Sequence, residues 1–390
     1  MLAVLDLPCH RTCRLRRLAR VTQPISTDPT TIRKALEDGR IRRVLAVRAS
    51  RLGDLLMTTP ALHAFHECYP EAEIHFLTND YSRAFLENEP DIAQIHTFGG
   101  RERDLLGKKA APLRGQLQTM GFDLLLALRP RKELMALAKQ LEIPFLFPTG
   151  QRGEDRKDQH VVQQCFDRIA PLGLEGQPGP MRLFLGENDR QAASKHIPEG
   201  SGPVVLLHPG TDETKRLWLW RGVRKRTWPQ SHWAELIQRL EQGLDARVLL
   251  SSGNAIEARW VQGILGGIDS RATHLCGLPL RQFCALFELS DLIITGDTGP
   301  LHIAAALGRP QLCLFGPSPA AYTGPWGPQA RVLTLDLPCS PCQGKKVRCP
   351  QNVCMEDLLP AQVYAQAWAS RSASATPTAA GASSDSSDSS

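Results

Sequence analysis

The clearest indication of the fold is the segment ITGDTGPLHIAAALGRP, residues Ile294–Pro310. It joins the end of an apolar run to a glycine-bearing turn and a helical pattern, with Pro300 in the first helical turn, where proline is tolerated. Backbone N–H groups and the positive end of a helix favour an anion at such a turn. We therefore predict an anion site at Thr298 and Gly299, with His302 early in the same helix. A capped helix with an internal histidine is the alternative.

The alternation of strand and helix continues on both sides of this junction. Apolar runs such as VVLLHPG (Val204–Gly210) and FDLLLAL (Phe122–Leu128) alternate with helical patterns in two stretches separated by a Gly/Pro-rich segment. This order predicts parallel sheets with right-handed crossovers and helices on both faces. We therefore predict an α/β protein with two doubly wound, Rossmann-like domains, residues 31–185 and 203–368, facing each other across a cleft. Ligands would lie outside the carboxyl ends of the strands.

The two ends of the chain differ in composition from the rest. Residues 1–30 are basic, and we predict a disordered extension that either touches an anionic membrane surface or has no role. Residues 370–390 are rich in Ser, Ala and Asp and predict a disordered tail, since they hold too few apolar groups to fold. No run approaches the roughly 18 consecutive apolar residues of a membrane span, so we expect a cytoplasmic protein.

Composition and missing motifs narrow the function classes. A net charge of +6 and an isoelectric point near 8.8 indicate anionic partners. Nucleic acid is disfavoured because no run interleaves aromatic residues with Lys and Arg. The first strand-to-helix junction has no G-x-G-x-x-G, and the chain has no G-x-x-x-x-G-K-[ST], which disfavours nicotinamide-dependent oxidoreductases and P-loop enzymes. A binding protein without catalysis stays open.

The first junction reads VRASRLGDLLMTTPALHAFHECYP, residues Val47–Pro70. Gly53 permits a tight turn after the strand, and Asp54 follows it. Spacing alone favours Asp54 as the N-cap of the next helix, where Asp is a preferred residue. A general base at the carboxyl edge of the sheet is the functional alternative.

Together these motifs resemble glycosyltransferase family 9, the ADP-heptose:lipopolysaccharide heptosyltransferases, over roughly residues 41–368. The family pattern R-x-S-x-x-G-D, followed by P-A-L, matches Arg48–Leu62. The pattern D-T-G-x-x-H-x-A-A-A-L matches Asp297–Leu307 and is followed by L-F-G-P at Leu314–Pro317. The turn His208–Gly210, which ends the first strand of the second domain, also has the family's form.

The resemblance implies a GT-B fold, with the acceptor in the N-terminal domain and an ADP-sugar in the C-terminal domain. It implies that Asp54 takes the proton of the acceptor hydroxyl, whose oxygen attacks the anomeric carbon with inversion. No metal is obligatory for catalysis, so protein donors stabilise the departing diphosphate. The expected reaction moves a heptose from ADP-heptose to a lipopolysaccharide core acceptor at the cytoplasmic face of the inner membrane. Another nucleotide sugar, or a nucleotide-sugar isomerase or binding protein, is the alternative.

The resemblance also assigns residues to the nucleotide-sugar site, namely Thr298, Gly299, His302, Asp297, Arg226, Lys225, Glu257 and His208. In the family a K-x-W-P sequence supplies a cation to the diphosphate, and here register places Arg226 there with Lys225 as its neighbour. The preceding segment Asp212–Arg224 is longer than in the family, which affects that register. Solvated surface charges are the alternative for both. Glu257 would bind the ribose hydroxyls, with a surface helix glutamate as the alternative.

Ser50 and Arg51 would lie on the acceptor side. The family often has a small serine where this chain has Arg51, and an arginine there favours an anionic acceptor such as a phosphorylated or carboxylated sugar.

The chain holds eleven cysteines, five of them scattered through predicted strands and helices as expected of reduced thiols. Four lie close together near the C-terminus, at Cys339, Cys342, Cys349 and Cys354. This spacing predicts either a structural zinc site or free or paired cysteines. A catalytic metal is not expected there.

Overall fold

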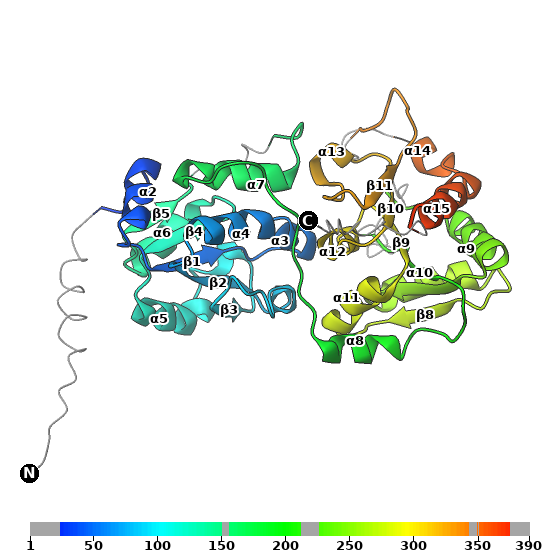
Figure 1. The fold of residues 1–390 in the computed structure, drawn as a ribbon, viewed down its shortest axis with the longest axis horizontal. Helices are drawn as coiled ribbons and strands as arrows, with labels where there is room; N and C mark the ends of the chain where they lie inside the picture. The colour runs from blue at the N-terminus through cyan, green and yellow to red at the C-terminus, as the bar shows by residue number, and fades with distance from the viewer. Residues whose placement is uncertain (1–23, 150–155, 212–225, 343–348, 350, 375–390) are drawn as a thin grey trace, which may run out of the picture.

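The computed structural model describes residues 24–149, 156–211, 226–342, 349 and 351–374, and it has two α/β lobes side by side (Figure 1). In these residues the N-terminal sheet consists of parallel strands in the order β3 (Gln94–Phe98), β2 (Glu73–Asn79), β1 (Arg43–Val47), β4 (Leu124–Ala127) and β5 (Phe145–Phe147). The C-terminal sheet is also parallel, in the order β11 (Ala330–Leu333), β10 (Gln311–Leu314), β9 (Leu292–Gly296), β6 (Val204–His208), β7 (Arg247–Ser252) and β8 (Thr273–Cys276). The predicted doubly wound α/β class is confirmed.

Helices cover both faces of the N-terminal sheet. Val44 and Ala46 face the core shared with α2 (Pro29–Glu37), α4 (Thr59–Cys68) and α7 (Val161–Ile169). Leu45 and Val47 face the opposite core, shared with α5 (Ala111–Met120) and α6 (Lys132–Gln140). Because successive residues of a strand point to opposite faces, a strand covered on both sides needs a continuous apolar run.

The C-terminal sheet is covered in the same way. Val205 and Leu207 pack on the face that carries α9 (Gln230–Leu244), α10 (Ala255–Leu265) and α15 (Pro360–Ser374). Val204 and Leu206 pack on the face that carries α11 (Leu280–Leu289) and α12 (Pro300–Ala306). Shorter elements complete the fold: α3 (Leu52–Leu56), η1 (Ser82–Phe85), η2 (Glu102–Asp104), η3 (Lys108–Ala110), η4 (Ala170–Leu172), α8 (Glu187–Ser194), α13 (Ala320–Thr323) and α14 (Val353–Glu356).

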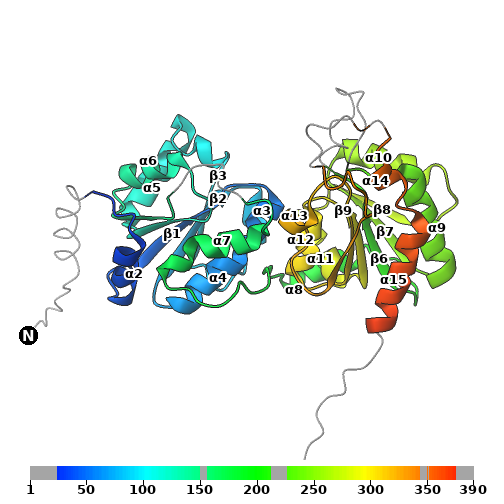
Figure 2. The ribbon, with the colours of Figure 1, turned by 90° about the horizontal axis from the view of Figure 1, so that it is seen from above.

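The lobes meet at α3 and α12, which lie next to each other in both views (Figures 1 and 2). From α7 the chain crosses to α8, which packs on α11 and therefore joins the C-terminal lobe ahead of the predicted boundary at residue 203. Arg281 of α11 fixes this crossing, since it donates to Asp189 at 2.7 Å, to the Phe184 carbonyl at 2.9 Å and to the Ala84 carbonyl of the N-terminal lobe at 2.8 Å.

In the sequence Asp54–Cys68 has one helical pattern, but the segment forms two helices, α3 and then α4. Pro60 has no N–H with which to continue the hydrogen bonds of α3. The hydroxyls of Thr58 and Thr59 donate to the carbonyls of Leu55 and Leu56 at 2.6 and 2.8 Å and satisfy the end of the first helix.

The predicted extension and tail are both too long. Ser26 bridges to Phe145 at the sheet edge and Asp28 caps α2, so residues 24–30 belong to the N-terminal lobe. At the other end α15 continues to Ser374, past the predicted tail boundary at residue 370. Residues 1–23 and 375–390 lie outside the described residues. Within the described part of the chain, no helix combines the length and the apolar character that crossing a membrane requires.

Candidate active site

Asp54 lies on α3, just beyond the carboxyl end of β1. The helix begins at Leu52 with Arg51 as its N-cap, and no side chain makes a capping hydrogen bond there. Asp54 is therefore a residue of the first helical turn, and its interpretation as the N-cap is wrong. Its side chain is 39% exposed, and one carboxylate oxygen lies 3.7 Å from Nη2 of the buried Arg48. The carboxylate is thus accessible to a ligand and faces a cation.

The turn that carries Asp54 is held from neighbouring segments. The Ser50 carbonyl accepts hydrogen bonds from Asn79 Nδ2 at 2.9 Å and from the Ser82 hydroxyl at 3.0 Å. On the other side the Ala49 N–H donates to Glu102 at 3.0 Å. These contacts fix the backbone of Ser50, the residue predicted on the acceptor side.

Glu102 is a site residue that the sequence did not reveal. Its carboxylate is buried, accepts the Ala49 N–H and forms an ion pair with Arg131, which follows β4. A buried carboxylate is rare unless it is paired and hydrogen-bonded, as this one is. In the sequence Glu102 stands within the charged run Arg101–Asp104, where nothing distinguishes it from a surface residue.

In the C-terminal lobe the predicted anion site follows β9. Gly299 is the N-cap of α12, and the Asp297 carboxylate lies 3.2 Å from Nη1 of Arg226. The Thr211 and Thr227 hydroxyls are 3.0 Å apart, so the described residues before and after residues 212–225 lie next to each other. Arg226 therefore lies beside Asp297, another residue predicted for the nucleotide-sugar site, and its role toward a diphosphate stays a prediction. Lys225 lies outside the described residues.

His208 and Glu257 lie at the same edge of the sheet. His208 pairs in register with Thr295 of β9, and its Nδ1 lies 2.9 Å from the Ser251 hydroxyl. Because that hydroxyl donates to the Leu207 carbonyl, Nδ1 is the donor to it. Glu257 is only 3% exposed and accepts the Gly253 N–H at 2.7 Å, so its interpretation as a surface helix glutamate is wrong.

His302 lies between the two lobes. Its ring is buried against α3, where a Cβ added to Gly53 would lie 2.4 Å from His302 Cδ2. Burial, with a smaller contribution from His160, lowers the pKa of His302 to about 3, so the imidazole is neutral. Among the described atoms, its Nδ1 is buried without a hydrogen-bond partner. The contact brings Asp54 of one lobe beside the anion site of the other.

Known proteins resemble the chain in sequence and in fold. The profile of glycosyltransferase family 9 (heptosyltransferase) matches residues 145–352, more than half of the chain. The chain belongs to glycosyltransferase family 9. This family 9 enzyme is 25% identical to lipopolysaccharide heptosyltransferase 1 of Pseudomonas aeruginosa over 78% of its own length and 86% of that protein. It is 26% identical to lipopolysaccharide heptosyltransferase 2 of Salmonella typhimurium over 75% and 88% of the two chains.

Solved structures show the same fold. The family 9 glycosyltransferase of Veillonella parvula superposes with a TM-score of 0.72 at 20% identity, covering 84% of this chain and 97% of that one. The E. coli ADP-heptose lps heptosyltransferase II superposes with a TM-score of 0.68 at 22% identity, covering 86% and 100%. The predicted GT-B architecture of this family 9 enzyme is thereby confirmed.

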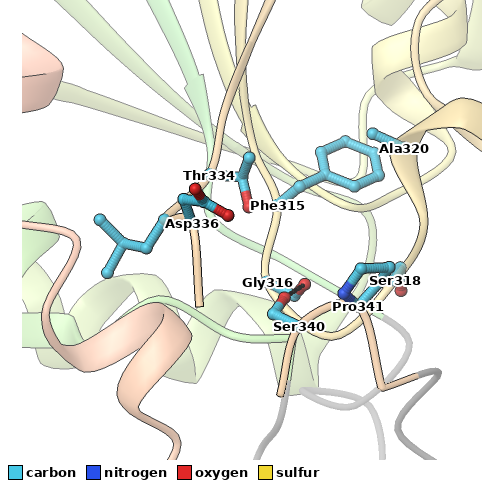
Figure 3. A pocket seen from close by; sticks show the side chains of 9 residues that line it. Phe315, Gly316, Ser318, Ala320, Thr334, Asp336, Ser340 and Pro341 are labelled. Atoms are coloured by element: carbon cyan, nitrogen blue, oxygen red, sulfur yellow. Dashed lines mark hydrogen bonds between the residues drawn. The ribbon is translucent and has the colours of Figure 1, made fainter. Parts of the chain in front are cut away.

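A pocket of about 350 Å³ lies at the carboxyl ends of β10 and β11 of this family 9 enzyme (Figure 3). It is on the side of β9 away from His208 and Glu257. The Ser340 hydroxyl donates to the Gly316 carbonyl at 2.7 Å and closes one side. The sequence did not predict this pocket. Its lining consists of Phe315, Gly316, Ser318, Ala320, Thr334, Leu335, Asp336, Ser340 and Pro341.

None of the four clustered cysteines of the family 9 enzyme forms a disulfide bond in the described residues. Cys354 is buried against Gly316, and burial together with the other three thiols raises its pKa to about 11. In the part of the chain that the structure describes, no group of three or more His, Cys, Asp or Glu side chains is arranged to hold a metal ion. Residues 343–348, between the second and third cysteines, lie outside that part, and the zinc site stays a prediction.

Proposed function

We propose that this enzyme moves a heptose from ADP-heptose to a core sugar of lipopolysaccharide, with inversion at the anomeric carbon. The observation that carries the proposal is the contact of Gly53 with His302, which sets an accessible carboxylate beside an anion-binding turn across the lobe boundary. The names of the family members similar to the chain, lipopolysaccharide heptosyltransferases 1 and 2, support the choice of sugar and acceptor.

In the proposed reaction Asp54 is the general base. The acceptor oxygen attacks the anomeric carbon from the face opposite the diphosphate and forms the new glycosidic bond. The bond between that carbon and the diphosphate oxygen breaks, ADP leaves with the electron pair, and the acceptor proton passes to Asp54. A partly exposed carboxylate at the edge of a cleft is suited to this role because it can reach a hydroxyl on a bound substrate.

The departing diphosphate needs a cation or preorganised donors to stabilise its charge. We assign this role to the Arg226 guanidinium and to the backbone at Thr298 and Gly299. Arg226 now faces Asp297, and a bound diphosphate would compete for the same guanidinium. His302 is neutral and adds no positive charge, so it serves as a hydrogen-bonding and packing group. We assign binding of the nucleoside to Glu257 and His208.

The acceptor would enter beside Arg51 and Ser50. Arg51 is exposed at the start of α3, where it favours an anionic sugar. Exposed cations also follow β3, at the same edge of the sheet as Asp54: Arg101, Arg103, Lys108 and Lys109. Because a lipid-linked acceptor lies in an anionic membrane surface, we propose that this side makes peripheral contact with the cytoplasmic face of the inner membrane.

One experiment separates this proposal from its alternative. The enzyme is incubated with ADP-heptose, with and without heptose-deficient lipopolysaccharide, and released ADP and the donor are both quantified. ADP release that depends on the acceptor supports transfer. Conversion of the donor without acceptor would instead support a nucleotide-sugar isomerase. Replacing the donor by UDP- and GDP-sugars tests the choice of ADP-heptose, which should give the highest kcat/KM.

A further inference from the structure

Arg48 is a buried cation at the centre of the N-terminal half of the site. It is the first residue after β1, and it continues the sheet: its N–H donates to the Leu77 carbonyl at 3.0 Å, and its carbonyl accepts the Thr78 hydroxyl at 2.9 Å. The residue is only 2% exposed. A ligand in the cleft therefore has almost no access to the guanidinium, and any effect of Arg48 on the reaction must pass through a neighbour.

The neighbour of opposite charge is Asp54. Nη2 of Arg48 lies 3.7 Å from an Asp54 carboxylate oxygen. Among the described atoms, the Nε and Nη1 groups of Arg48 are buried and have no hydrogen-bond partner. A buried guanidinium is costly unless it is paired, so a purely structural role would leave this charge poorly compensated.

Cys165, Arg129 and Arg168 also lie near Arg48, and none of them neutralises its charge. Burial raises the pKa of the Cys165 thiol of α7, which stays protonated and neutral, and the charge of Arg48 acts on that same thiol. Arg129 and Arg168, which also act on Cys165, carry the same sign as Arg48. The ion pair of Arg48 and Asp54 is therefore asymmetric: its cation is buried and fixed, and its carboxylate is accessible from the cleft.

We propose that Arg48 is a positioning residue that holds the Asp54 carboxylate toward the acceptor. This inference rests on the proposed role of Asp54 as the base. Arg48 is anchored by the sheet through its backbone, whereas Asp54 lies on a five-residue helix at the edge of the cleft. The enclosed cation attracts one carboxylate oxygen and leaves the other for the acceptor hydroxyl. Without it, the carboxylate would sample orientations that do not meet that hydroxyl, and such a loss lowers kcat rather than binding.

The test is a double-mutant cycle of Arg48→Met and Asp54→Asn, measured as acceptor-dependent ADP release. Arg48→Met should lower kcat by about 10- to 100-fold, part of the roughly 10²- to 10⁴-fold that a positioned base contributes, with both KM values within about twofold. In the Asp54→Asn background the same substitution should change kcat by less than about twofold, because the group it positions is gone. Arg48→Lys, which keeps the charge, should recover part of the rate.

Arg43→Met is the matched control, because Arg43 is the first residue of β1 and pairs with Glu73 at the surface, and it should leave kcat unchanged. Measurements of ADP affinity and of the midpoint of thermal unfolding check that the Arg48→Met enzyme folds. If it does not fold, Arg48→Lys replaces it in the double-mutant cycle. An equal loss in both backgrounds, or a raised KM with kcat intact, would overturn the inference. An Asp54→Asn enzyme with nearly full activity would instead refute the base, a failure of the proposed function.

Discussion

Replacing Gly53 by alanine tests whether the contact between the lobes sets the geometry of the site. The added Cβ would lie 2.4 Å from His302 Cδ2 and 3.0 Å from its Nε2. Because ordinary contacts of a Cβ begin near 3.4 Å, α3 and the His302 ring must separate by about 1 Å. The ring is buried, so the movement falls at least partly on the helix that carries Asp54.

A displacement of about 1 Å at a reacting group can cost about 10²-fold in rate, which corresponds to about 2.7 kcal/mol of transition-state stabilisation. We therefore expect Gly53→Ala to lower kcat for acceptor-dependent ADP release by about 10²-fold. Alanine favours a helix over glycine by up to about 1 kcal/mol, so the N-terminal lobe itself should not be destabilised by the backbone change. Circular dichroism and thermal unfolding check that expectation.

Gly115→Ala is the matched control, since Gly115 lies in α5 and a Cβ there meets no atom within 4 Å. It should leave kcat unchanged. Combining Gly53→Ala with His302→Ala should cost no more than His302→Ala alone, because the clash is then removed. A Gly53→Ala enzyme with kcat within about twofold of the original would refute the reasoning.

The remaining predictions concern the cation, the buried histidine and the cysteines. Arg226→Ala should lower kcat/KM by about 10²-fold and Arg226→Lys by less, because lysine keeps the charge but not the planar fork; an effect no larger than that of exposed Arg239→Ala would contradict the assignment. The folded-state pKa of His302, about 3, is below its ordinary 6.5, so the unfolded chain binds the extra proton and stability falls as pH drops through that window. Urea unfolding at pH 7 and pH 5 should show a fall that is about 2 kcal/mol smaller in His302→Gln, and an equal fall would refute the neutral imidazole. Metal analysis of protein purified without added zinc separates the two alternatives for Cys339, Cys342, Cys349 and Cys354: about one zinc per chain indicates a structural zinc site, and a metal-free, stably folded protein indicates free thiols.

The sequence predicted what depends on local pattern. Buried strands such as Leu124–Ala127 need an uninterrupted apolar run, and Gly299 and Pro300 mark a helix start directly, so both features could be identified without the structure. Arg226 could be placed through the register of a short motif, although a long segment intervenes before it.

The features that the sequence did not predict depend on contacts between residues far apart in the chain. Spacing alone favours Asp54 as a cap because the helix is expected to begin after it, whereas α3 begins at Leu52, which packs against Gly299 of the other lobe. Glu102 contacts Ala49 across 53 positions of the chain, and no local pattern encodes such a pairing. From the sequence, Gly53 can be identified only as a turn residue, because the His302 ring, which leaves no room for a side chain at this position, lies in the second lobe.

The most direct test of the central claim is the rate of the Asp54→Asn enzyme. Asparagine keeps the size of the side chain but cannot take the acceptor proton. Acceptor-dependent ADP release should fall by about 10²- to 10⁴-fold, while the affinity for ADP, which we propose binds to the other lobe, should be unchanged. An Asp54→Asn enzyme that keeps most of its rate would contradict the account.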